Sequence, residues 1–364
     1  MKFNVVKIAA LAAVVFLPSS PSDAQQVGDS VTIKTITLLH TSEAYQAHTY
    51  TADALWVGKS KQTEGDSHRI EVYVDQGSRL LGTVNLPHTP SFAYPYGTNS
   101  VLVVGKSFSD EWRTHYSIIS KTGDTLTLKT KNLPGQYQVE QGAANSQFKF
   151  FSEKGEARVL VEANNRAVRA LSPVISGPAQ MQLVGDNLFV IESRNSGLGD
   201  ENIVKIDLKN ESAERTFTDY YRQGITEIRH IPGTNMLAAN EALTGKVLLI
   251  DESTNKLVSQ LDVVRDIRAL ETLGHCLIAS AAEDRKLSFI DVRDAAVPAV
   301  IDTWDLSPAG ETLRRPNSLA VDAKTGTIYV RSTWTCPTCA PNTQSSVVAL
   351  TQASRKTINR CLAD

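Results

Sequence analysis

The chain repeats one short β-rich motif seven times, and this repeat limits the possible folds more than any other feature. The motif starts near residues 54, 100, 147, 187, 235, 275 and 327. Clear copies are ALWVGKS from Ala54, NLFVIESR from Asn187 and TIYVRSTW from Thr327. The mean spacing of about 45 residues is typical of a unit built from four short strands. Such a unit cannot bury its faces alone, so neighbouring units must pack against one another.

Each motif lies among three further runs with strand character. An alternating run follows it, as in RIEVYVD from Arg69, and this alternation places one face of a strand against a neighbouring sheet. A polar turn and an outer run come next, as in KLVSQLDV from Lys256, and a fourth run precedes the motif, as in SLAVD from Ser318. Four antiparallel strands in each of seven units predict an all-β fold, a seven-bladed β-propeller, with residues 25–364 as a single domain.

Both ends of this domain offer a segment that could close the ring of blades. VTIKTITLL from Val31 lies before the first complete blade, and KTINRCL from Lys356 is a candidate outer strand for the last blade. Pairing across the seam removes exposed strand edges, which are sites of aggregation. The sequence leaves open which end makes this pairing.

The first 24 residues have the pattern of a secretory signal peptide. Lys2 and Lys7 form a basic start, residues 8–17 are apolar, and Ser22-Asp23-Ala24 has the small residues of a cleavage site. The apolar run is too short to span a bilayer, and no other run approaches the roughly 20 residues that spanning needs. We therefore expect an exported protein, periplasmic or extracellular, with no transmembrane segment in the mature chain.

The charge balance argues against nucleic acid as a partner. The chain has 37 Lys and Arg against 39 Asp and Glu, with a formal net charge of -2. Proteins that bind DNA or RNA carry basic patches against the phosphates, and no block of Lys or Arg occurs here. The Gly-Lys-Ser sequences at Gly58 and Gly105 lack the earlier glycine of a phosphate-binding loop, so we interpret them as the ends of blade strands.

Over residues 42–361 the blade pattern resembles the YVTN-type and WD-repeat-like bacterial propellers. The resemblance is one of architecture, because there is no literal YVTN tetrad and the Gly-His and Trp-Asp pair of the WD repeat does not recur from blade to blade. It implies a disc with a central channel. It transfers no catalytic residue, because this superfamily includes binding scaffolds, hydrolases, lyases and subunits of redox enzymes.

Polar residues stand where the innermost strand of each blade should begin, and we expect them to gather at one mouth of the channel. They are Gln46, His48, Ser91, Glu140, Gln180, Glu227, Arg229, Asp266, Arg268 and Asn317. In one interpretation these charges pair with one another and solvate the channel. In the other they form a polar ligand site, because opposed charges on rigid strands can orient a bound group at little entropic cost.

The loops between the second and third strands should lie on the same face as this channel mouth, and they differ most among the blades. They supply seven candidate contacts for a partner, namely Trp112, Arg113, His115, Arg194, Asp200, Glu201 and Trp334. Trp and Arg are common anchors of protein interfaces, and loops on a rigid scaffold often carry function. We call this side of the disc the loop face, and the side with the shorter turns the turn face.

Four cysteines follow the signal peptide. Cys336 and Cys339 lie in one loop, and export makes a disulfide between them the favoured interpretation. A redox role and a zinc or haem association are the alternatives, although Ala340 stands where the haem signature Cys-x-x-Cys-His needs histidine. We expect Cys276, in an apolar strand, to be a buried thiol. Cys361 is either free or competes for Cys336 or Cys339.

Two classes of function are compatible with these features. The first is an exported, non-enzymatic scaffold that presents the loop face to a protein, peptide or envelope component. The alternative is an enzyme at the channel mouth, either a lactonase-like metal-dependent hydrolase or a subunit of a periplasmic dehydrogenase. We predict no cofactor from local motifs, but distant blades could bring ligands to a channel-bound metal ion. Arg-carboxylate pairs in the channel would favour the scaffold, and three converging oxygen or imidazole ligands would favour the enzyme.

Overall fold

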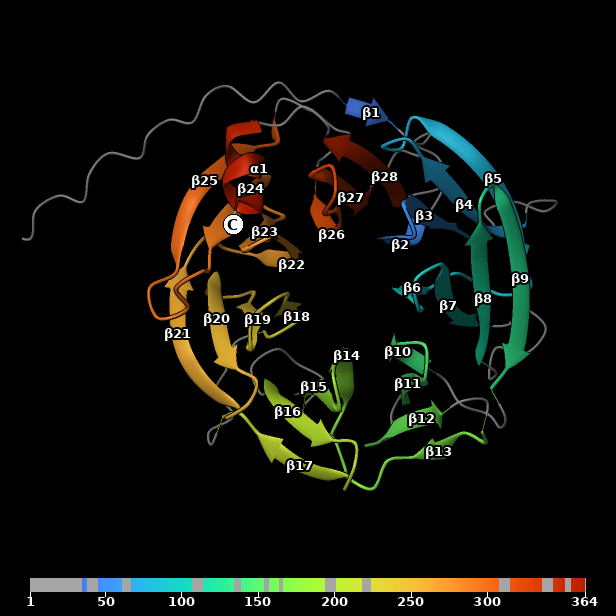
Figure 1. Ribbon diagram of the computed structural model, residues 1–364, viewed down its shortest axis with the longest axis horizontal. Coiled ribbons are helices and arrows are strands. Elements are labelled where there is room, and N and C mark those ends of the chain that lie inside the picture. The colour runs from blue at the N-terminus through green and yellow to red at the C-terminus, as the bar shows by residue number, and fades with distance from the viewer. Residues whose placement is uncertain are drawn as a thin grey trace, which may run out of the picture.

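Seven four-stranded sheets surround one axis, which confirms the predicted seven-bladed propeller (Figure 1). The computed structural model describes residues 35–37, 45–60, 67–106, 114–133, 139–153, 157–163, 166–193, 201–217, 224–307, 315–335, 343–350 and 355–363. In the first six blades the strands run outward from the axis in chain order. No helix within these ranges is long and apolar enough to cross a membrane.

Blades 1 to 3 are each built from one continuous region of the chain. Blade 1 contains β2 (Tyr45–Thr51), β3 (Ala54–Lys59), β4 (His68–Val74) and β5 (Arg79–Leu86). Blade 2 contains β6 (Phe92–Pro95), β7 (Ser100–Lys106), β8 (Thr114–Thr122) and β9 (Thr125–Asn132). Blade 3 contains β10 (Val139–Ala144), β11 (Phe148–Glu153), β12 (Val159–Ala163) and β13 (Arg169–Ala170).

Blades 4 to 6 follow the same plan, and blade 7 departs from it. Blade 4 contains β14 (Pro178–Val184), β15 (Asn187–Ser193), β16 (Glu201–Asp207) and β17 (Ser212–Arg215). Blade 5 contains β18 (Ile228–Ile231), β19 (Met236–Glu241), β20 (Lys246–Asp251) and β21 (Lys256–Asp262). Blade 6 contains β22 (Ile267–Leu273), β23 (Cys276–Ala281), β24 (Lys286–Asp291) and β25 (Ala299–Asp305). Blade 7 contains β26 (Pro316–Asp322), β27 (Thr327–Thr335), β28 (Thr343–Leu350) and β1 (Thr35–Thr37).

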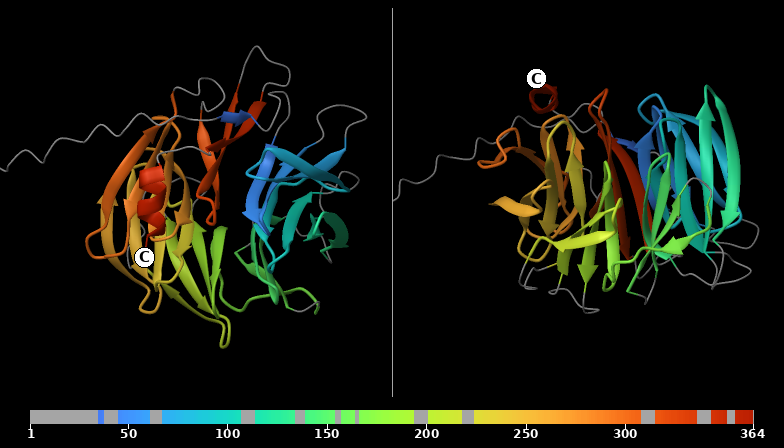
Figure 2. Two further views of the ribbon diagram at one scale, coloured as in Figure 1. Left: turned by 45° about the horizontal axis from the view of Figure 1, so that its top comes forward. Right: turned by 60° about the horizontal axis from the view of Figure 1, so that its bottom comes forward.

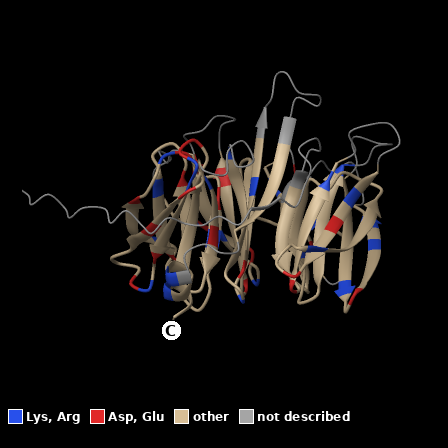
Figure 3. Ribbon diagram, turned by 90° about the horizontal axis from the view of Figure 1, so that it is seen from above, with Lys and Arg blue, Asp and Glu red and all other residues tan. Residues whose placement is uncertain are grey.

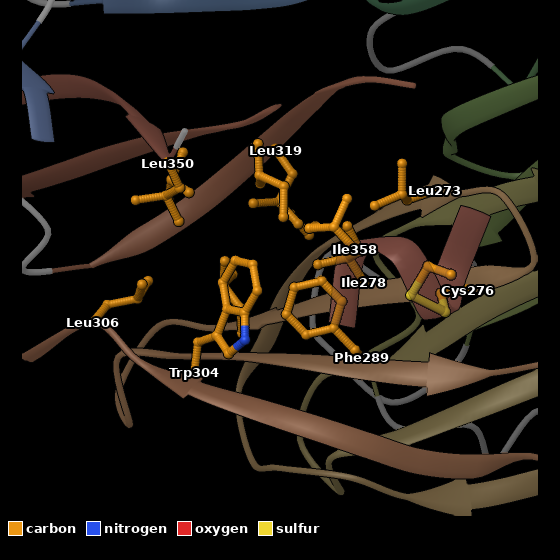
Figure 4. Packing of buried hydrophobic residues seen from close by; sticks show 14 of the residues in the cluster. Leu273, Cys276, Ile278, Phe289, Trp304, Leu306, Leu319, Leu350 and Ile358 are labelled. Carbon is orange, nitrogen blue, oxygen red and sulfur yellow. A yellow bond between two sulfur atoms is a disulfide. The ribbon is translucent and has the colours of Figure 1, made fainter. Parts of the chain in front are cut away.

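The repeated motif forms the second strand of each blade, where burial is greatest. Every residue of β3, β19 and β23 is buried, whereas outer strands such as β21 alternate between exposed and half-buried residues. Side chains from adjacent blades meet in shared clusters. Between blades 6 and 7, Trp304 packs against Phe289 with ring centroids 4.3 Å apart, and Leu319 and Ile358 belong to the same cluster (Figure 4). Apolar burial between neighbouring blades therefore holds the ring together.

A buried ionic cluster joins blades 2 and 3. Glu162, on β12, is fully buried and accepts hydrogen bonds from Tyr116 Oη at 2.9 Å and Lys131 Nζ at 3.0 Å. Lys149, also buried, places its Nζ 3.3 Å from Glu162 Oε1 and 5.3 Å from the ring centroid of Tyr96. Burial opposes ionisation of Glu162, but these hydrogen bonds and positive charges outweigh it, so its pKa lies below the usual value.

The N-terminal segment closes the ring. β1 pairs with β28 in antiparallel register, with Thr35 opposite Leu350, and supplies the outer strand of blade 7 (Figure 1). The other candidate for this strand, KTINRCL, does not form a strand, because those residues belong to the helix α1 (Arg355–Leu362). Thr357, Ile358 and Cys361 are buried while the residues between them are exposed, and this spacing is that of a helix with one apolar face.

Helix α1 packs on the turn face of blades 6 and 7, outside the ring of strands (Figure 2). Cys361 forms a disulfide with Cys276, so the interpretation of Cys276 as a buried thiol is wrong (Figure 4). Thr357 Oγ1 donates a hydrogen bond to Asp302 Oδ2, and His275 N donates one to the carbonyl of Cys361 at 3.1 Å. Cys336 and Cys339 lie outside the described residues, so the disulfide between them stays a prediction.

Candidate functional site

A β-bulge interrupts the innermost strand near its start in five of the blades. The register shifts occur in β2, β10, β14, β22 and β26. The residues that the pairing omits are Gln46, Glu140, Ala179, Gln180, Arg268 and Asn317. All but Ala179 are among the polar positions that the sequence placed at the channel mouth. Bulges redirect side chains and are frequent beside binding sites. Two of these residues, Gln180 and Asn317, line the cavity in the channel.

A cavity of about 500 Å³ occupies the channel. Six of the polar residues expected at the mouth line it, namely His48, Ser91, Gln180, Glu227, Arg229 and Asn317. Asp266 and Arg268 do not line this cavity; instead Arg268 Nε forms an ion pair with Asp266 Oδ1. Glu140 lies in β10 opposite no partner residue, and its side chain is outside the described part of the structure.

Arg229 lies between two carboxylates in the channel. Its Nη2 is 3.1 Å from Glu227 Oε2, and its Nε is 3.6 Å from Glu271 Oε2. Burial disfavours the charge on Arg229, but the two carboxylates outweigh this effect and raise its pKa above the usual value. Burial raises the pKa of Glu227, although Arg229 partly opposes that shift. Strands β18 and β22, together with Glu227 directly before β18, thus hold a preformed Arg-carboxylate cluster in the wall.

Arg331 brings a second guanidinium to the cavity wall from β27, the second strand of blade 7. It pairs with Ser318 directly after the bulge of β26. The residues with the same relation to the bulge in blades 1, 3 and 6 are Gly58, Ser152 and Ser280. Burial lowers the pKa of Arg331 to about 10, and attraction to Glu227 limits the shift. The equivalent residues are small in blades 1, 3 and 6 and apolar in blade 4, where Val190 pairs with Met181, so the charge of Arg331 points to function.

His48 is buried at the junction of blades 1 and 7. Its Nδ1 is hydrogen-bonded to Ser318 Oγ at 3.2 Å, and the ring lines the cavity. Burial, followed by the positive charge of Arg331, lowers the pKa of His48 to about 3, against the opposing effect of the Tyr329 backbone. The imidazole is therefore neutral at physiological pH.

Lowering the pH below 6.5 should destabilise the protein through His48 and His88. Burial also lowers the pKa of His88 to about 4, and its Nε2 accepts a hydrogen bond from Ser117 Oγ at 2.8 Å. Both folded pKa values lie below the unfolded value of about 6.5, so the unfolded chain binds the protons first. The stability is complete above pH 6.5 and is lost as the pH falls toward 4.

Urea unfolding at pH 7.5, 6.0 and 5.0 checks this expectation. Each histidine should contribute a slope of about 1.4 kcal/mol per pH unit within the window. Replacing His48 or His88 by Gln should remove one such contribution, because glutamine keeps a polar side chain but does not titrate there. An unchanged slope in both variants would mean that neither histidine is held neutral by the fold.

The loop-face residues are described only in part. Trp112, Arg113, Arg194 and Asp200 lie outside the described residues, and for Trp334 the structure describes the backbone of β27 alone. His115 lies on β8, where its ring stacks with that of His88 at a centroid distance of 6.1 Å. Glu201 is buried, and its Oε2 accepts a hydrogen bond from Gly224 N at 3.1 Å. Glu201 thus helps to join blades 4 and 5.

Sequence reasoning missed two charged residues of the cavity wall, Glu271 and Arg331. Glu271 lies within the innermost strand β22 rather than at its start, where we looked for the mouth. Arg331 lies on a second strand, which the repeat identifies as core. A signal did exist for Arg331, because an alignment of the seven motifs places it where ALWVGKS has Gly58 and QFKFFSEK has Ser152.

Basic and acidic residues are mixed in a side view of the described part of the chain (Figure 3). Figure 3 shows Lys and Arg interspersed with Asp and Glu on both sides of the ring. Within the described ranges, no group of three or more His, Cys, Asp or Glu side chains is arranged to hold a metal ion. The chemistry that the cavity offers is thus that of guanidinium, carboxylate, amide and hydroxyl groups held on strands.

No protein-family model matches the chain, and no curated protein matches its sequence. Solved structures share the fold at low sequence identity. The WD40 repeats of RRP9 align with a TM-score of 0.63 and 10% identity, over 88% of this chain and 100% of that one. A chain of the mitotic checkpoint complex aligns with a TM-score of 0.60 and 11% identity, over 94% and 99% of the two chains. Streptogramin B lyase aligns with a TM-score of 0.60 and 12% identity, over 88% and 98%. The chain is thus a seven-bladed β-propeller similar in fold to WD40-repeat proteins and to streptogramin B lyase.

Proposed function

We propose that the protein is an exported binding scaffold that engages a protein, peptide or envelope component through its loop face and channel mouth. The observation that carries this proposal is the position of Arg229 between Glu227 and Glu271. These charged groups contact one another and form a preformed polar surface. Such a surface can orient a partner by complementary hydrogen bonds at little entropic cost, which is the chemistry of recognition.

The architecture supports the same proposal. The strands that carry Arg229 and Glu271 are innermost in their blades, and Glu227 directly precedes the first of them, so these side chains are held on or beside rigid elements. The sequence predicts that the candidate partner anchors, such as Trp112, lie in loops between second and third strands, on the same face as this channel mouth. A partner could therefore contact the loops and place one polar group in the channel.

Site-specific crosslinking tests this proposal. A photoreactive benzoylphenylalanine replaces Ser91, which lines the cavity, or Val258, which is exposed on the outer strand β21 and serves as the matched control. In an envelope extract of the source cells, position 91 should yield a discrete adduct that position 258 does not, and mass spectrometry identifies its chemical class. Equal labelling at both positions, or no adduct at position 91, would contradict a partner on this face.

Once the adduct is identified, Trp112→Ala should weaken binding of that partner by about 1–4 kcal/mol, as expected for an interface anchor. Its thermal stability should stay close to that of the parent protein, and Val258→Ala should change neither property. Binding that is unchanged in Trp112→Ala and Trp334→Ala but lost in Arg229→Ala would move the site into the channel. That result would favour the alternative of an enzyme at the channel mouth.

A further inference from the structure

The charges on the cavity wall are balanced. Among the described lining residues, Arg229 and Arg331 oppose Glu227 and Glu271, and His48 is neutral. A ligand with a net charge would leave one charge in the channel without compensation, which is strongly unfavourable away from bulk water. The balance therefore favours a ligand with no net charge.

The contacts of Arg229 further restrict the ligand. A zwitterionic ligand could pair its two charges with groups of the wall only by competing with the existing contacts of Arg229 to Glu227 and Glu271. A hydroxyl group has no such conflict, because it can donate to a carboxylate oxygen and accept from a guanidinium N–H at the same time. Neutral hydroxyl-bearing ligands thus fit this wall better than ions.

Neutral polar groups complete the wall. Ser91, Thr226, Gln182 and Ser318 all line the cavity, and each already makes one hydrogen bond within the protein, with Thr89, Asn240, the Leu183 carbonyl and His48, respectively. Their hydroxyl and amide groups keep further donor or acceptor capacity for a ligand. The Oδ1 atom of Asn317 is buried and accepts no hydrogen bond from the described residues. A buried acceptor without a donor is costly, so a ligand hydroxyl that donates to Asn317 would gain more than it would at a solvated group.

One side of the cavity is aromatic. Phe92 and Tyr94 alternate on β6, so they lie on the same face of the strand, and their rings stack with centroids 6.5 Å apart and an interplanar angle of 18°. Tyr94 Oη accepts a hydrogen bond from Gly142 N at 2.9 Å, which fixes its ring against blade 3. Both residues line the cavity, and aromatic side chains in the wall suit a ring that has C–H groups on its face.

We propose that the channel mouth binds one neutral pyranose unit of a sugar or glycan. This inference rests on the proposed function and assigns the envelope component to a chemical class. A pyranose has no net charge, many hydroxyl donors and acceptors, and an apolar face, and each of these features has its counterpart on the wall. The volume of about 500 Å³ lies within the range of small-molecule sites.

Saturation-transfer NMR and isothermal titration calorimetry on the full mature chain provide the test. The probes are methyl α-D-glucopyranoside, methyl α-D-galactopyranoside, methyl α-D-mannopyranoside and N-acetyl-D-glucosamine, with glucuronate and glycylglycine as charged and zwitterionic comparators. At least one neutral sugar should bind with a Kd at least about tenfold below those of both comparators. The proposal is overturned if no neutral sugar shows saturable binding, or if either comparator binds as tightly.

Two variants test the site itself. Gln182→Trp should fill the cavity and abolish sugar binding, whereas Val258→Trp on the outer strand should bind as the parent does; thermal unfolding shows that each has folded. Glu271→Gln leaves the channel with a net positive charge, so the preference should shift toward glucuronate by about tenfold or more. An unchanged preference in Glu271→Gln would overturn the charge argument. If no sugar binds but position 91 still yields a specific adduct, the pyranose proposal is rejected and the proposed binding scaffold is retained.

Discussion

Replacing Glu162 by Ala should lower the free energy of unfolding by about 3–5 kcal/mol, as expected when one partner of a buried ion pair is removed. Lys149 is 1% exposed, and its Nζ lies 3.3 Å from the Glu162 carboxylate. Without that carboxylate, Lys149 would keep a charge that water cannot reach, and Tyr116 would lose the acceptor of its hydroxyl. Because these residues come from blades 2 and 3, the loss should weaken the contact between the two blades.

Urea unfolding of three variants measures this effect. Asp186→Ala is the matched control, since Asp186 Oδ2 lies 2.6 Å from Lys209 Nζ but both side chains are mostly exposed; its cost should stay below about 1 kcal/mol. Adding Lys149→Met to Glu162→Ala should recover part of the loss, because it removes the charge left behind. Equal effects of Glu162→Ala and Asp186→Ala would show that burial of the cluster does not matter to stability.

Removing the disulfide with Cys276→Ala and Cys361→Ala should cost about 2–5 kcal/mol, the usual range for a native disulfide. The bond joins residues 85 positions apart, and closing so long a loop restricts the unfolded chain considerably. It also holds helix α1 on the turn face, where Ile358 completes the apolar cluster between blades 6 and 7. The variant should therefore lose both the constraint on the unfolded chain and the packing of the helix.

Chemical unfolding with and without a reductant measures this contribution. Reduction should bring the parent protein to the stability of the double variant and leave the double variant unchanged. Cys336→Ser with Cys339→Ser is the informative comparison, since a bond between them would close a very short loop and add little. Peptide mapping under non-reducing conditions should find Cys276 joined to Cys361. Mapping that joins Cys361 to Cys336 or Cys339 would contradict the structure.

The repeat was sufficient to predict the fold because each blade is made of local strand pairs whose pattern recurs. The positions at the channel mouth could be predicted for the same reason, and Gln180 and Asn317 line the cavity near the start of their strands. The repeat could not predict which distant segments of the chain contact one another. The pairing of Cys276 with Cys361 depends on where the chain goes after β28, and no local pattern encodes that path.

The helix at Lys356, where the sequence also allowed a strand, has a similar cause. The segment KTINRCL is too short for the spacing of its apolar residues to distinguish a helix from a strand. Its conformation depends on whether the edge of β28 is already paired. β1 takes that edge, so the later segment must bury its apolar side chains elsewhere, which it does as α1. The alignment of the motifs marks Arg331 as an unusual residue in a core strand, but only the structure shows that its side chain lines the channel.

The pairing of Thr35 with Leu350 makes assembly of the last sheet depend on two segments that are far apart in the sequence. Six sheets can form from contacts between near neighbours as soon as each stretch is available, and such contacts form quickly. The seam needs an encounter between segments more than 300 residues apart, so we infer that it forms last and sets the pace of maturation. A product shortened at either end would keep six sheets but expose an unsatisfied edge, a feature that marks incomplete molecules for aggregation or proteolysis.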